Sequence, residues 1–120
     1  MKNHPFTARL GFAFAGLRAA WQHEQSFRTQ SGFALAALLL LLLVRPTPIW
    51  WALIGVMVML VLAAELINTA LEHLADHLHP EQHPKIKLVK DCAAAAVLLL
   101  SLGSVWLVVM MLFTTFSAPH

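Results

Sequence analysis

Polar residues recur at helical spacing where a long apolar run ends. They stand at i, i+3, i+7 and i+11, and they are Glu65, Asn68, Glu72 and Asp76. This spacing places all four on one face of an α-helix, and we call that face the acidic stripe. The segment before Glu65, VMVMLVLAA, is apolar. Glu65 is therefore expected inside hydrocarbon or at its edge, where an ionised carboxylate without a partner costs several kcal/mol.

Two interpretations fit the acidic stripe. Glu65 and Asn68 could hydrogen-bond between helices of a bundle, with Asp76 at a solvated helix end. Alternatively, a carboxylate held away from water can act as a general base, and carboxylates nearer water can hold a divalent cation. Glu65 would then be the base and Glu72 a metal ligand. Lys90 and Asp91 open the next apolar segment and could close on the same site, with Lys90 supplying a positive charge for phosphate.

Long apolar runs must carry these residues through a membrane. The chain has 120 residues, of which 59% are hydrophobic and 12% charged, and its mean hydropathy of +0.71 lies outside the range of soluble domains. A bilayer core requires about 20 residues per helix. We predict an all-α integral membrane protein, with residues 1–120 in a single domain and spans at about 29–45, 49–72 and 88–116.

The basic residues are distributed asymmetrically. Seven of the eight lie before the first span or between the second and third, and only Arg45 lies in the other loop. The positive-inside rule therefore predicts a cytoplasmic N-terminus. Residues 6–24 have a helical pattern too polar to span, so we predict an amphipathic helix on the inner membrane surface. All six acidic residues then lie on the cytoplasmic side or at its boundary, where the chemistry is expected.

A histidine-rich segment offers a different kind of site. His73 and His77 stand at i and i+4 on a helix. Together with Asp76, His79 and His83 they could bind zinc. A solvated helix end followed by a polar loop is the other interpretation. The motif HLADH lacks the glutamate that follows the first histidine in zinc proteases.

A nucleotide-binding P-loop can be excluded. The segment GFAFAGLR has the glycine spacing of a nucleotide-binding P-loop, but Leu17 and Arg18 stand where Lys and Ser or Thr are required.

Two other functions remain open beside an enzymatic role for the acidic stripe. One is a non-enzymatic, metal-responsive membrane subunit that uses the histidines. The other is an ion or proton carrier that uses Glu65 and Asn68.

Three blocks together resemble a known family. The segments GLRAAWQHEQSFR, ELINTALEHLAD and HPKIKLVKDCAAAAVL are similar to the signature blocks of the prokaryotic diacylglycerol kinase family, which includes undecaprenol kinases. The likeness runs from about residue 9 to residue 100. It implies a homotrimer of three-span subunits in the bacterial inner membrane, with active sites between neighbouring subunits. It also implies ATP, Mg²⁺ and a membrane lipid as ligands, and no nucleic-acid partner.

The resemblance also implies roles for individual residues. Glu65 matches the catalytic base and Asn68 its neighbour, while Glu24 and Glu72 match the carboxylates that hold Mg²⁺. The residues that match nucleotide contacts are Glu81, His83, Lys90 and Asp91, together with Phe12, which stands where some members have tyrosine. The residues that match lipid contacts are Arg9, Arg18, Trp21, Gln30, Glu65 and Ala94, the last of which is serine in some diacylglycerol kinases.

The expected function is phosphoryl transfer from MgATP to the hydroxyl of diacylglycerol, which gives phosphatidic acid. Undecaprenol is the alternative acceptor. ATP is soluble in water and the acceptor is not, so the catalytic groups must lie where both can arrive. The acidic stripe crosses that boundary.

Overall fold

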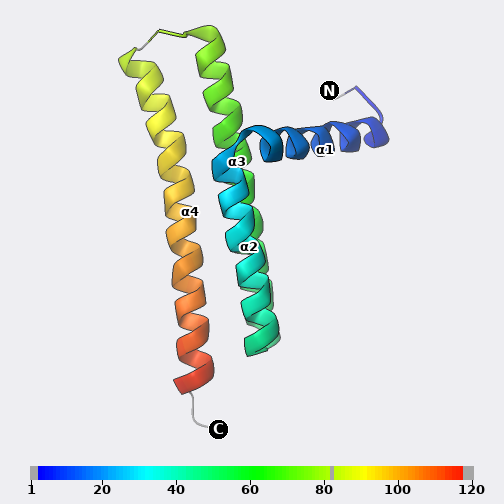
Figure 1. The fold of residues 1–120 in the computed structure, drawn as a ribbon, viewed down its shortest axis with the longest axis vertical. Coiled ribbons are helices and arrows are strands. Elements are labelled where there is room, and N and C mark those ends of the chain that lie inside the picture. The colour runs from blue at the N-terminus through cyan, green and yellow to red at the C-terminus, as the bar shows by residue number, and fades with distance from the viewer. Residues whose placement is uncertain (1–2, 82, 118–120) are drawn as a thin grey trace.

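The fold consists of four consecutive helices. The computed structural model describes residues 3–81 and 83–117, and within them the helices are α1 (Phe6–His23), α2 (Gln25–Val44), α3 (Pro48–Leu78) and α4 (Pro84–Ser117). In Figure 1, α2, α3 and α4 run along the long axis of the molecule, and α1 projects sideways from the start of α2. Helix α3 packs against both α2 and α4. The prediction of an all-α chain is confirmed.

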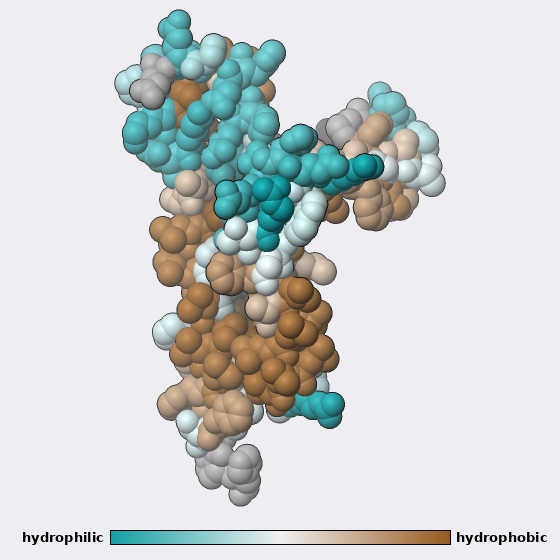
Figure 2. Space-filling view, in the orientation of Figure 1, coloured by the Kyte–Doolittle hydropathy of each residue, from teal (hydrophilic) through white to brown (hydrophobic). Residues whose placement is uncertain are grey.

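Three of the helices, α2, α3 and α4, are long and apolar enough to cross a membrane. This confirms the prediction of three candidate spans. In Figure 2, the hydrophobic surface covers the part of the molecule that these helices share, and the hydrophilic surface gathers at the end where α3 and α4 are joined. The polar end and the apolar body are thus separated along the axis of the helices.

A single residue separates α1 from α2. Glu24 has extended backbone angles, φ −118° and ψ 109°, so it ends α1 and precedes the first residue of α2. Helix α2 therefore begins at Gln25, earlier than the span predicted from residue 29. The other end of α2 closes at Arg45, which has a left-handed φ of 51°. Pro48 then begins α3, where its missing N–H costs nothing.

The polar ends of α3 and α4 extend further than the predicted spans. Helix α3 continues to Leu78 instead of ending near 72, and α4 begins at Pro84 instead of near 88. With 31 residues, α3 is about 46 Å long, whereas the hydrocarbon core is about 30 Å thick. Pro80 disfavours helix at the residue before it, which explains where α3 stops. The two extensions carry polar residues beyond the membrane on facing helices.

All three spans contribute to a buried apolar cluster at the end away from the polar loop. Leu41, Ile54 and Met111 form a buried cluster with one residue from each of α2, α3 and α4. Nearer the polar end, the Gln30 amide donates a hydrogen bond to Ser101 Oγ at 3.0 Å and so joins α2 to α4. Such hydrogen bonds between spans typically hold bundles together. This packing leaves the polar end of the bundle available for a site.

Candidate active site

Glu65 is the one buried charged residue among those that the structure describes. It lies on α3 and is 4% exposed. Its Oε2 accepts a hydrogen bond from Ser26 Oγ at 3.1 Å. Ser26 is the second residue of α2, and the break at Glu24 brings this first turn alongside α3. The hydroxyl offsets part of the cost of burying the carboxylate.

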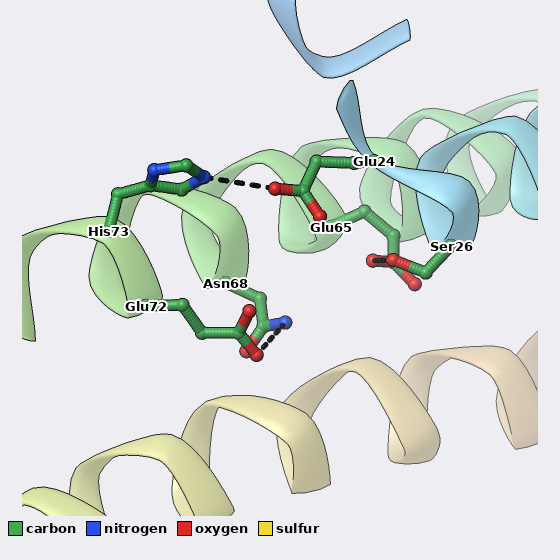
Figure 3. A network of polar contacts seen from close by, with 6 residues as sticks. All are labelled: Glu24, Ser26, Glu65, Asn68, Glu72 and His73. Atoms are coloured by element: carbon green, nitrogen blue, oxygen red, sulfur yellow. Dashed lines mark hydrogen bonds and ion pairs between the residues drawn. The ribbon is translucent and has the colours of Figure 1, made fainter. Parts of the chain in front are cut away.

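Asn68 and Glu72 form a second polar pair, one turn apart on α3. Asn68 Nδ2 donates to Glu72 Oε1 at 3.3 Å. In Figure 3 this pair projects on the side of α4, whereas Glu65 is directed at Ser26 on α2. The other amide atom, Asn68 Oδ1, is buried and has no hydrogen-bond partner within the described residues. A buried acceptor left unpaired costs about 1–3 kcal/mol, so it is a natural place for a ligand donor or a cation.

Glu24 is held by a histidine from α3. Its Oε1 lies 3.0 Å from His73 Nε2, and the Glu24 side chain is only 22% exposed against 69% for His73. Figure 3 shows this pair bridging the break between α1 and α2 to the neighbouring helix. The three carboxylates of this region are thus Glu24, Glu65 and Glu72, each with a different partner.

A cavity of about 500 Å³ lies beyond this group, at the junction of α3 and α4. Within it, Lys90 Nζ donates to Asp76 Oδ1 at 2.5 Å and so ties α4 to α3. The lining residues are mostly charged groups, imidazoles and prolines: Asp76, His79, Pro80, Glu81, His83, Pro84, Ile86, Lys87 and Lys90. A site of this size and polarity suits a polar ligand of moderate size.

Hydrogen bonds fix the rings of the two cavity histidines. His79 Nδ1 lies 2.9 Å from the Glu81 carbonyl oxygen, which can only accept, so this nitrogen carries a hydrogen. His83 Nδ1 accepts from the Lys85 backbone N–H at 3.1 Å, so it carries none. In neutral rings, His79 Nε2 is then an acceptor and His83 Nε2 a donor. The cavity therefore offers hydrogen-bonding groups of both kinds.

Asp91 lies beside this cavity rather than in its lining. It accepts a hydrogen bond from Lys87 Nζ at 2.6 Å, one turn earlier on α4. That hydrogen bond, together with the negative charge of Asp91, raises the pKa of Lys87 above its ordinary value. Lys87 accordingly stays cationic at the rim of the cavity.

The predicted site residues fall into groups that the structure brings together and others that it leaves apart. Glu24 and Glu65 lie where the first turn of α2 meets α3, Asn68 and Glu72 lie on the side of α4, and three more, Glu81, His83 and Lys90, line the cavity. Asp76, one turn beyond Glu72 on α3, connects the two regions.

Apart from Glu65, the predicted lipid contacts lie elsewhere in this single chain, as does Phe12. Phe12 packs edge-on against His4, with ring centroids 5.4 Å apart. Gln30 bonds to Ser101, and the Trp21 carbonyl oxygen accepts from Arg28 at 2.7 Å. Exposed positions on α1 and α4 hold the remaining three, which are Arg9, Arg18 and Ala94. Their roles stay predictions.

Two partners of the carboxylates are absent from the predicted site. Neither the residue pattern nor the resemblance predicts a role for Ser26, and His73 is predicted only as part of a possible zinc site. The sequence points to Ser26 only through its position two residues after Glu24. Its hydrogen bond to Glu65 on α3 depends on the helix break at Glu24. His73 is next to Glu72 in the chain and therefore points to another side of α3. Its partner there is Glu24, at the corner between α1 and α2.

The donor atoms fit magnesium better than zinc. Within residues 3–81 and 83–117, no group of three or more His, Cys, Asp or Glu side chains is placed to hold a metal ion. A closed zinc site requires four protein ligands, so the described part of the histidine-rich segment does not form one. Magnesium, by contrast, keeps several waters and takes one or two carboxylates plus phosphate oxygens. The carboxylates of Glu24 and Glu72 are donors of that kind, and so is the amide oxygen Asn68 Oδ1, which lies one turn from Glu72 on α3.

The fold and the site define a class of protein: a small multi-pass membrane protein with carboxylates and lysines where its apolar spans meet a polar end. Residues 11–113 match the family described as prokaryotic diacylglycerol kinase. The chain belongs to this family of lipid kinases, and the resemblance seen in the sequence is confirmed.

Curated relatives carry two different names. The chain is 35% identical over 89 residues to the diacylglycerol kinase of Escherichia coli (strain K12), covering 74% of this chain and 73% of the relative. It is 36% identical over 89 residues to the undecaprenol kinase of Bacillus subtilis (strain 168), covering 72% of each. A diacylglycerol kinase of Synechocystis is 34% identical over 95 residues, which cover 78% of this chain and 54% of that relative.

Proposed function

We propose that this protein transfers the γ-phosphate of ATP to the hydroxyl group of diacylglycerol and so forms phosphatidic acid. One observation carries the proposal. Glu65 is a buried carboxylate, 4% exposed, and it lies one turn from the unpaired acceptor Asn68 Oδ1. Membership of a lipid kinase family supports ATP as the donor and a lipid as the acceptor.

In the proposed mechanism, Glu65 is the general base. The lipid hydroxyl donates its hydrogen to the Glu65 carboxylate, which takes the proton as the hydroxyl oxygen attacks the γ-phosphorus. Phosphoryl transfer requires mainly positioning and charge neutralisation, because its transition state has little covalent chemistry to assist. Asn68 Oδ1, which lacks a partner within residues 3–81 and 83–117, would accept a hydrogen bond from a bound group and hold it beside the base.

The metal ligands in this proposal are Glu24 and Glu72. Bound Mg²⁺ would neutralise charge on the transferring phosphates. His73 holds the Glu24 carboxylate at 3.0 Å, and Asn68 holds that of Glu72 at 3.3 Å. These hydrogen bonds restrict both side chains before any ligand arrives, which lowers the entropy that ordering them would cost.

The nucleotide would occupy the cavity at the junction of α3 and α4. Its volume of about 500 Å³ lies within the usual range of about 300–1,000 Å³ for small-molecule sites. Lys87 and Lys90 provide cations for phosphates, and His79 and His83 provide hydrogen-bonding groups for the base or ribose. Glu81 and Asp91 complete the proposed nucleotide contacts. From this cavity the triphosphate would extend along α3 past Asp76 towards Glu72.

Undecaprenol is the second candidate acceptor. The Escherichia coli diacylglycerol kinase and the Bacillus subtilis undecaprenol kinase are 35% and 36% identical to this chain. Walls of Leu, Ala and Met discriminate weakly between apolar chains, so the residues around the site favour neither lipid. Purified protein given labelled ATP with each lipid separately would separate the two. We expect the higher rate on diacylglycerol, and a higher rate on undecaprenol would reassign the acceptor.

We also propose a homotrimer in the bacterial inner membrane with a cytoplasmic N-terminus. Arg9, Arg18, Trp21 and Ala94 lie apart from the cavity within one chain, which supports a site completed by a neighbouring subunit. The single cysteine, Cys92, is exposed near the start of α4 and tests the orientation. A membrane-impermeant thiol reagent should label it in inverted vesicles and not in intact spheroplasts. Light scattering of the detergent-solubilised protein tests the trimer.

The decisive experiment replaces Glu65 by glutamine, which keeps the shape of the side chain and removes the basic carboxylate. General-base catalysis contributes about 10²–10⁴-fold to rates, so E65Q should lose at least 100-fold in lipid phosphorylation. ATP binding, measured by calorimetry, should stay within a factor of three. His77→Gln is the matched control, because His77 is exposed on the same helix and does not line the cavity. Turnover by E65Q close to that of H77Q would reject Glu65 as the base.

A further inference from the structure

The partner of the buried carboxylate is itself an alcohol. Ser26 Oγ donates to Glu65 Oε2 at 3.1 Å, which is the relationship that the proposed mechanism requires of the lipid hydroxyl. Serine and diacylglycerol both offer a primary alcohol. We propose that Ser26 is a second phosphoryl acceptor, and that without lipid the protein phosphorylates itself at this residue. The inference rests on the proposed function, since it uses the same base and the same donor.

The surroundings of Ser26 allow a phosphate to approach it. Ser26 is exposed in this chain, whereas Glu65, which accepts its hydrogen bond, is buried. Glu24, a proposed magnesium ligand, lies only two residues earlier in the chain. Figure 3 shows Ser26 and Glu24 on the same short stretch of chain, with the Glu65 side chain reaching Ser26 from α3. The acceptor oxygen and the metal carboxylate are therefore held by one rigid corner.

The start of α2 would also tolerate the product. Its first turn holds no acidic residue, and no side chain caps its first backbone N–H groups. A phosphate on the second residue of a helix gains from these N–H groups and from the positive end of the helix dipole. The product would thus be stabilised locally even though it lies near Glu65.

The proposed step balances as follows. A bond forms between Ser26 Oγ and the γ-phosphorus of ATP, and the bond between that phosphorus and the oxygen bridging to the β-phosphorus breaks. ADP leaves with the electron pair of the broken bond. The hydroxyl proton passes to Glu65 Oε2, which later releases it to water. Phosphoserine at position 26 would then hold Glu65 away from a lipid hydroxyl, so self-phosphorylation would slow the lipid reaction.

The experiment uses the full-length protein in detergent micelles that contain no acceptor lipid, incubated with γ-labelled ATP and Mg²⁺. The expected result is covalent label that mass spectrometry maps to Ser26. Ser26→Ala should remove the label, and Ser26→Thr should carry it as phosphothreonine. Ser31→Ala, a serine change on the same helix, should label like the unaltered protein. E65Q should label at least tenfold less, which excludes a contaminating kinase, and added diacylglycerol should also reduce labelling.

Different outcomes separate this inference from the function on which it rests. If the protein phosphorylates lipid but carries no label at Ser26, self-phosphorylation is rejected and the proposed function stands. Label that survives in S26A, or that is unchanged in E65Q, also rejects the inference. If neither lipid nor Ser26 is phosphorylated, the proposed function fails and this inference fails with it.

Discussion

Lys90 Nζ and Asp76 Oδ1 lie 2.5 Å apart and join the start of α4 to the end of α3. Asp76 belongs to the part of α3 that extends past the predicted span, and Lys90 lies at the start of the predicted third span. They are 37% and 64% exposed, and an ion pair so exposed contributes only about 0–1 kcal/mol to stability. Stability therefore does not account for the placement of these charges. Because this ion pair is weak, Lys90 can replace the Asp76 carboxylate by a phosphate group at little cost in free energy.

The first prediction concerns Lys90 and the nucleotide. Lys90→Ala should raise the KM for ATP about tenfold, which corresponds to the loss of about 1.4 kcal/mol of charge-assisted binding. Steady-state kinetics at varied ATP measures it. Lys85→Ala is the matched control, because Lys85 is an exposed lysine on the same helix that does not line the cavity. An equal effect of K85A would point to the general positive charge rather than to Lys90.

The second prediction concerns the magnesium carboxylates. Glu72→Ala and Glu24→Ala should each raise the Mg²⁺ concentration needed for half-maximal activity by at least fivefold, because each removes one proposed ligand. Binding of Mn²⁺ in the presence of a non-hydrolysable ATP analogue, followed by electron paramagnetic resonance, provides a readout independent of turnover. Unchanged Mn²⁺ binding in both variants would remove these residues from the metal site.

The third prediction concerns His73, which holds Glu24 at 3.0 Å. His73→Ala should weaken Mn²⁺ binding less than Glu24→Ala does, because it frees the carboxylate without removing it. His73→Gln can still donate from its amide and should restore most of the loss. If H73A binds Mn²⁺ more tightly than the unaltered protein, the histidine competes with the metal instead of orienting its ligand.

The fourth prediction separates function from stability at Asn68. Asn68 Oδ1 is buried and unpaired in the described part of the chain, so it costs folding free energy while no ligand is bound. Asn68→Leu should lower lipid phosphorylation at least tenfold without lowering the thermal unfolding midpoint in detergent. A lower midpoint with normal activity would show instead that Asn68 holds the bundle together.

The fifth prediction tests the two roles open to Gln30. As the donor to Ser101 Oγ at 3.0 Å, Gln30 joins α2 to α4, and such hydrogen bonds in membranes contribute about 0.6 kcal/mol. Gln30→Leu and Ser101→Ala should therefore destabilise the bundle by similar small amounts, and their double-mutant cycle should show coupling. If Gln30 also contacts lipid, only Q30L should raise the apparent KM for diacylglycerol. Equal KM values for the two variants would leave Gln30 a purely structural role.

The sequence alone determined which segments are helical and which polar residues share one face of α3. Helical hydrogen bonds join residues four apart, and the length of a span is set by the bilayer, so both can be inferred from local pattern. Pro48 marks the start of α3, which is predicted at about residue 49, for an equally local reason, since a first helical residue needs no N–H partner. Helix α4, by contrast, begins at Pro84, earlier than the predicted residue 88. The shared face of Glu65, Asn68 and Glu72 follows from spacing in the same way.

Only the tertiary structure decided how those residues are paired. Side chains on one face of α3 turn to different partners: Glu65 to Ser26 on α2, and Glu72 to Asn68 on the side of α4. The pairing depends on a single extended residue, Glu24, which turns the chain and sets the first turn of α2 beside α3. Contacts between helices far apart in the chain depend on how the helices pack, which no local pattern encodes.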